Sequence, residues 1–122
     1  MLMKVLFNAV TLMFIFISTS SMAVVGFTSG VPVAIQKSDW SSLALVYVKF
    51  ETPIDKGNCT NGDGVVILDS NPSSKAALSF AMMAQASGKK FKCYVESHSS
   101  CSHVTGSIET FPVCTHYPSV VN

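Results

Sequence analysis

The chain has 122 residues, of which 48% are hydrophobic and 12% are charged, and its formal net charge is +1. This length allows one domain. All eight basic residues are lysine, and they do not form the basic patch that phosphate binding needs, so a nucleic-acid partner is not expected. No apolar run reaches the roughly 18 residues that a membrane-spanning helix needs.

The first 23 residues have the order of a secretory signal peptide. Lys4 supplies a positive charge, residues 5–17 are apolar apart from two positions, and residues 18–23 are mostly small and polar. We therefore expect residues 1–23 to be removed on export, leaving a secreted domain of residues 24–122. The alternative is an N-terminal membrane anchor, for which the apolar segment is short.

Three segments of the first half have strand patterns. Residues 31–36 alternate between apolar and other side chains, and residues 43–50 are rich in β-formers. Residues 55–64 hold three glycines and two asparagines and predict a loop. Residues 65–68 are short and apolar on both faces, as expected of a central strand.

A helix is predicted next. Asn71 can cap its start and Pro72 can occupy its first position, where a missing N–H is tolerated. Residues 76–86 consist largely of alanine, leucine and methionine, which are good helix formers, and Gly88 is a left-handed stop. Apolar side chains surround much of this helix, which fits either a single-chain core or a subunit interface.

Two more strands are expected after the helix. Residues 91–96 alternate clearly, residues 98–106 form a polar loop, and residues 108–114 are a strand weakened by a proline. The tail, residues 115–122, has no periodicity. The resulting order β-β-β-α-β-β predicts an all-β protein with one helix, specifically the five-stranded OB-fold barrel.

Export decides how the four cysteines are interpreted. A small secreted domain commonly uses disulfides to support a limited core, and four cysteines allow three pairings. The rival interpretation is a zinc site at His98, Cys101 and His103, but repeated CxxC or HxxxH spacing is missing. We therefore expect two disulfides, with no metal and no cofactor.

The sequence carries no recognisable catalytic motif. The three aspartates at 55, 63 and 69 do not have EF-hand spacing, and no nucleophile elbow or phosphate-binding glycine loop is present. We therefore expect a binding protein and not an enzyme. Trp40 is the only tryptophan, and it could serve either as an aromatic platform for a sugar or as a cap on the core.

Three segments of the predicted domain resemble a known family. These are Phe27-Thr-Ser-Gly-Val31, the helix end Ala84-Gln-Ala-Ser-Gly-Lys-Lys90, and Phe91-Lys-Cys-Tyr-Val-Glu96. Together with the signal peptide and the OB order, they are similar to the B subunits of subtilase cytotoxin and its typhoid-toxin relatives. The resemblance rests on short motifs that span most of the secreted domain.

The resemblance implies a ring-shaped homo-pentamer that binds sialylated glycans on host cells and carries a catalytic A subunit. Ser29 matches the family's sialic-acid-contacting serine, and Glu96 matches a residue beside its sugar pocket. Val95 stands where the family has a tyrosine, and the family's aspartate before the serine has no counterpart. The alternative functions are a secreted structural or inhibitory protein-binding module and, more distantly, a metal binder.

The OB order also suggests a disulfide pairing. Cys93 and Cys114 fall on the fourth and fifth predicted strands, which an OB fold makes near neighbours at disulfide distance. The loops that contain Cys59 and Cys101 could meet at one end of the barrel. We therefore expect Cys59–Cys101 and Cys93–Cys114, with Cys93–Cys101 and Cys59–Cys114 as the competing pairing.

Overall fold

The computed structural model describes residues 26–39, 44–104 and 108–122. The predicted signal peptide and Trp40 lie outside these residues. The described part is mostly β with one helix between strands, which confirms the general fold class. Its elements are β1 (Gly26–Gly30), β2 (Pro32–Ser38), β3 (Leu45–Phe50), β4 (Gly64–Leu68), α2 (Ser74–Ser87), β5 (Lys90–Val95), β6 (Cys101–His103), β7 (Thr110–Pro112) and β8 (His116–Val121).

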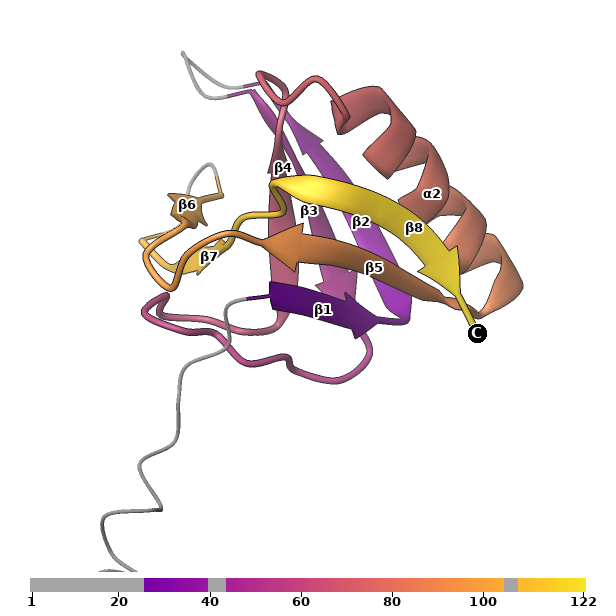
Figure 1. The fold of residues 1–122 in the computed structure, drawn as a ribbon, viewed down its shortest axis with the longest axis horizontal. Helices are drawn as coiled ribbons and strands as arrows, with labels where there is room; N and C mark the ends of the chain where they lie inside the picture. The colour runs from indigo at the N-terminus through magenta and orange to yellow at the C-terminus, as the bar shows by residue number, and fades with distance from the viewer. Residues whose placement is uncertain (1–25, 40–43, 105–107) are drawn as a thin grey trace, which may run out of the picture.

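The strands form two three-stranded antiparallel sheets and a small hairpin. One sheet has the order β1-β5-β8, the second has the order β2-β3-β4, and β6 pairs with β7. Figure 1 shows the first sheet in front of the second, with α2 on one side and the hairpin on the other. Val31 alone separates β1 from β2, so the chain passes directly from one sheet into the other. A parallel bridge between Val66 and Val113 joins β4 to the segment that leads into β8.

The helix spans the open side between the two sheets, where it packs mainly on β8 and β2. Its inward face consists of small residues, Ala77, Ala81 and Ala84, which are fully or nearly fully buried. Small side chains let the helix approach the sheets closely. Met82 and Met83 point outward and are 55% and 56% exposed.

The start of the helix differs from the prediction, whereas its end agrees. Ser73 is the N-cap residue, and Asn71 lies in the preceding turn, so the expected cap at Asn71 and first position at Pro72 are wrong. Asn71 Oδ1 instead accepts a hydrogen bond from the Ser73 N–H at 2.9 Å, and its Nδ2 donates to the Thr115 carbonyl at 2.9 Å. Asn71 therefore ties this turn to the chain before β8. Gly88 ends the helix with a φ of 68°, as predicted.

The strand count also differs, because the described residues contain eight strands where five were predicted. β1 lies upstream of the first predicted strand, β6 lies in the expected polar loop, and β8 lies in the tail that showed no pattern. Most of β8 is partly buried on both faces, because α2 packs on it while β5 pairs with it. Such a strand has no simple apolar–polar alternation to detect.

Both disulfides join the predicted partners. Cys59 pairs with Cys101 at a Cα–Cα distance of 5.5 Å, and Cys93 pairs with Cys114 at 5.6 Å. The zinc alternative is therefore wrong, since its only thiolate is bonded. Two disulfides indicate an extracytoplasmic protein. No helix in the described part of the chain has the length and apolar character of a membrane span.

Candidate functional site

The outer face of the sheet β1-β5-β8 carries an unusual group of side chains. Along β5, Phe91 and Cys93 are fully buried in the core and Val95 is nearly so. The side chains of Lys92 and Tyr94 therefore point to the opposite, outer face, because successive residues of a strand alternate. Pairing places Phe27 of β1 beside Tyr94, and His116 of β8 on its other side.

These rings form what we call the aromatic cluster, made of Phe27, Tyr94, His116 and Tyr117. The centroids of Phe27 and Tyr94 are 5.3 Å apart in an edge-to-face arrangement. Tyr117 lies 6.2 Å from each of these two rings and 5.7 Å from His116. Such spacings are typical of interacting aromatic pairs. The cluster nevertheless faces outward, since Phe27 is 51% exposed and Tyr117 is 68% exposed.

Tyr117 has a backbone conformation that favours glycine. Its φ is 55°, and it is the only non-glycine residue with a positive φ in the described part of the chain. An aromatic residue in this region is a genuine outlier that costs about 1–3 kcal/mol. Strain of this kind collects at functional positions. Here it places an exposed ring beside Phe27 and Tyr94.

Polar groups border the cluster on the same sheet face. The Lys92 ammonium lies 4.4 Å from the centroid of Phe27, within the range of a cation–π contact. Ser29 is the strand neighbour of Lys92 and is exposed, two residues from Phe27 on the same side of β1. The arrangement thus combines aromatic faces, one cation and a hydroxyl.

The residues expected to bind glycan are placed as follows. Ser29 lies at one border of the aromatic cluster, and Glu96 is exposed directly after β5, beyond the other border. Because Ser29 pairs with Lys92, Ser29 and Glu96 are separated by about 13 Å along the strands, four residues at roughly 3.3 Å each. They flank the cluster and do not touch each other. Trp40 lies outside the described residues.

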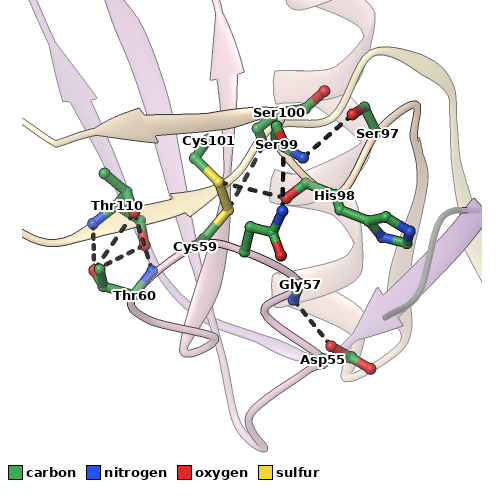
Figure 2. The surroundings of a disulfide bond; sticks show 11 residues. Asp55, Gly57, Cys59, Thr60, Ser97, His98, Ser99, Ser100, Cys101 and Thr110 are labelled. Atoms are coloured by element: carbon green, nitrogen blue, oxygen red, sulfur yellow. Dashed lines mark hydrogen bonds between the residues drawn. A yellow bond between two sulfur atoms is a disulfide. The ribbon is translucent and has the colours of Figure 1, made fainter. Parts of the chain in front are cut away.

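A second feature lies beside the Cys59–Cys101 disulfide. Figure 2 shows the loop before β4 and the loop after β5 held together at this bond. The Asn58 N–H donates to the His98 carbonyl at 3.0 Å, which adds a backbone link between the two loops. A narrow pocket with room for about one water molecule lies between these loops and the ends of β1 and β5.

Sequence reasoning missed most of the cluster. The alternation of residues 91–96 already placed Lys92, Tyr94 and Glu96 on one face, but the strands on either side were not predicted. The remaining signal was the His116-Tyr117 pair, which lies in a tail that has no helical or strand periodicity.

No protein-family model, curated protein or solved structure matches this chain.

Proposed function

We propose that this protein is a secreted, non-enzymatic binding module of OB-fold type that recognises cell-surface glycans through the aromatic cluster. The observation that carries the proposal is the outward-facing group of Phe27, Tyr94 and Tyr117. A connected cluster of four rings on a sheet surface is unusual unless the surface binds something. The C–H faces of sugar rings are apolar enough to pack on exposed aromatic rings, whose polar neighbours can then bind sugar hydroxyls.

The connectivity supports the OB assignment. If β1 and β2 are counted as one bent strand that takes part in both sheets, β4 is the third strand, and the helix follows it. The last segment bridges β4 in parallel at Val66 and Val113, then pairs with β5 as β8. This path links both sheets in a cycle, which is how a five-stranded Greek-key barrel closes. OB folds commonly bind oligosaccharides or oligonucleotides.

Charge favours a glycan over a nucleic acid. OB folds that bind single strands combine stacking aromatics with a positively charged groove that follows the phosphates. This chain has a net charge of only +1, and Lys92 is the one lysine of the described residues with a cation–π contact to the cluster. A single cation beside aromatic rings suits a neutral or singly acidic sugar better than a phosphate chain.

The toxin-like part of the proposal concerns assembly. A ring of five copies would carry an associated catalytic subunit and present several glycan sites at once, which raises avidity. The exposed methionines of α2, Met82 and Met83, offer an apolar surface for contacts between copies. Export is the last part of the proposal. It predicts that the secreted chain begins at Val24, and a mass measurement of the intact protein would show this.

A glycan array with the secreted protein is the first test. Tyr117→Asn is the sharpest variant, because asparagine tolerates a positive φ and so removes the ring without adding backbone strain. We expect it to fold at least as stably as the parent and to lose array binding. Val33→Ala is the matched control, since Val33 is 49% exposed on β2 and lies outside the cluster.

The alternative is a module that binds a protein through the same cluster. Exposed aromatic residues on a β surface also suit a protein interface, and the two functions share the ring residues. Glycan binding that survives Tyr117→Asn would contradict the site. Protein binding would be favoured if no glycan on the array is bound and if Tyr117→Asn abolishes capture of a protein partner.

A further inference from the structure

An open groove lies beside the aromatic cluster, between the turn that leads into α2 and the start of β8. Its volume is about 330 Å³, at the lower end of the range of about 300–1,000 Å³ that small-molecule sites span. Residues 70–73 form one wall, residues 113–116 form the other, and Leu68 at the end of β4 completes the lining. In Figure 1 the start of β8 lies next to β4, whose end leads into this turn. The groove therefore has room for a small organic molecule.

The groove and the aromatic cluster share His116. This residue lines the groove, and the centroid of its ring lies 6.4 Å from that of Tyr94 and 5.7 Å from that of Tyr117. Its neighbour Thr115 also lines the groove, and the Thr115 N–H and Oγ1 both donate to the Tyr94 carbonyl, at 2.8 and 3.1 Å. The two surfaces are therefore contiguous, and a chain-like ligand that packs on the rings can extend past His116 into the groove.

Hydrogen bonds and a disulfide hold the two walls of the groove in place. Asn71 links them, because its Nδ2 donates to the Thr115 carbonyl at 2.9 Å while its Oδ1 accepts from the Ser73 N–H at 2.9 Å. The Cys114 N–H donates to the Val66 carbonyl at 2.8 Å, and the Cys114 sulfur is held in a disulfide. The groove is thus preformed, and a ligand does not have to order its walls on binding.

The lining of the groove suits a neutral sugar. Leu68, Pro72 and Val113 supply apolar contacts, and Ser70 and Ser73 supply hydroxyls. Ser73 is the N-cap residue of α2, but its hydroxyl makes no capping hydrogen bond and so is available to a ligand. Among the described residues, no lysine and no carboxylate lines the groove. A sugar ring presents an apolar C–H face together with hydroxyls that donate and accept hydrogen bonds, and it needs no charged partner.

We infer that the groove binds the second sugar unit of a glycan whose first unit packs on the aromatic cluster, so that the protein recognises oligosaccharides in preference to single sugars. This inference rests on the proposed glycan function and deepens it, because it sets the minimum length of the ligand at two units and requires the second unit to be neutral. A second unit adds ligand atoms in contact with a preformed surface. A disaccharide should therefore bind at least about tenfold more tightly than the monosaccharide that forms its first unit.

The test compares methyl glycosides of galactose, glucose, mannose and N-acetylglucosamine with disaccharides that carry the same sugars at their non-reducing end. NMR titrations of the intact secreted protein measure each affinity and locate each contact. A monosaccharide that binds should shift the ring resonances of Tyr94 and Tyr117. The matching disaccharide should also shift the amides of Ser70 and Val113, and its affinity should be higher by at least about tenfold.

Ser70→Trp is the sharpest variant, because Ser70 is an exposed turn residue that lines the groove, and an indole there would fill it. We expect this variant to bind disaccharides no more tightly than monosaccharides, with its monosaccharide affinity unchanged. Ala76→Trp is the matched control and should keep the full gain, since Ala76 is exposed in the first turn of α2 and does not line the groove. Ser73→Ala removes one hydroxyl without adding bulk and should reduce the gain severalfold, which keeps the test decisive where Ser70→Trp fails to fold.

The outcomes separate this inference from the proposed function. Equal affinity for monosaccharides and disaccharides, or a full gain retained in Ser70→Trp or in Ser73→Ala, overturns the groove site and leaves the cluster site standing. Loss of all sugar binding in Tyr117→Asn, together with loss of the gain in the groove variants, supports both sites. Absence of any sugar binding by the parent protein overturns the proposed function, and the inference falls with it.

Discussion

The Cys93–Cys114 disulfide should supply a large share of the stability of this domain. The bond closes a loop with a sequence separation of 21 residues. The chain-entropy relation converts that length into about 3.3 kcal/mol at 25 °C. Both cysteines are buried, at 0% and 4% exposure, so replacing them with alanine also removes two packed sulfur atoms. That loss adds about 1–2 kcal/mol, which brings the expected total to about 4–5 kcal/mol.

Three double variants separate these contributions. Cys93→Ala with Cys114→Ala loses both the crosslink and the packing. Cys93→Val with Cys114→Ala refills the fully buried position and should recover about 1 kcal/mol. Cys93→Ser with Cys114→Ser buries two hydroxyls and should be the least stable, by about a further 1–3 kcal/mol for each unpaired group.

Urea unfolding followed by circular dichroism measures the differences. With a slope of about 1.5 kcal/mol per molar, the double alanine variant should shift the midpoint by about 3 M. A total stability of about 5–15 kcal/mol means that this variant could be close to unfolded without urea. A shift below about 0.5 M would refute the reasoning, because it would mean that the crosslink constrains the unfolded chain very little.

Three other perturbations should have defined outcomes. Gly64→Ala should destabilise the protein by about 2–4 kcal/mol in urea unfolding, because a Cβ there would lie 2.1 Å from a carbonyl oxygen of β3. Gly88→Ala is the control, since Gly88 faces open space, and it should cost about 1 kcal/mol. Burial and, to a smaller extent, two nearby carboxylates raise the pKa of the Tyr47 hydroxyl. The folded state therefore holds this proton more tightly than the unfolded state does. The resulting contribution to folding stability is present below pH 10 and is lost as the pH rises through the folded pKa. Tyr47→Phe should therefore reduce the loss of thermal stability at alkaline pH, measured in short thermal melts. Met82→Lys with Met83→Lys should convert a ring to monomers in light scattering if α2 forms the contacts between copies, and an unchanged mass would rule out that surface.

Local patterns predicted the parts of the fold in which one physical factor dominates. The segment 91–96 alternates because one face of β5 is core and the other is solvent, so both faces were assigned correctly. Gly88 was recognised as the helix end because few other residues adopt its conformation at so little cost. The disulfide pairing followed from the strand order, since the topology that brings β5 beside the C-terminal segment also brings Cys93 beside Cys114.

The elements that escaped prediction depend on tertiary contacts. Asn71 has a good capping side chain, but it bonds the Ser73 N–H within a turn and the Thr115 carbonyl across the fold, so the helix begins later. β8 contains Pro118, which argues against a strand on local grounds, and its Tyr117 adopts a left-handed conformation that is unusual within a strand. Pairing with β5 and packing against α2 overcome those preferences.

The disulfide and the aromatic cluster occupy opposite faces of the same junction. The pairing of β5 with β8 shifts register between Lys92 and Tyr94, just where Cys93 is bonded to the chain before β8. Thr115 follows Cys114 and donates its N–H to the Tyr94 carbonyl at 2.8 Å. The Cys93–Cys114 disulfide on the inner face therefore fixes the point at which the chain enters β8. From this point His116 and the strained Tyr117 lie beside Tyr94 on the outer face. Because a left-handed tyrosine persists only where its surroundings are strongly constrained, the crosslink both stabilises the fold and preorganises the proposed binding surface.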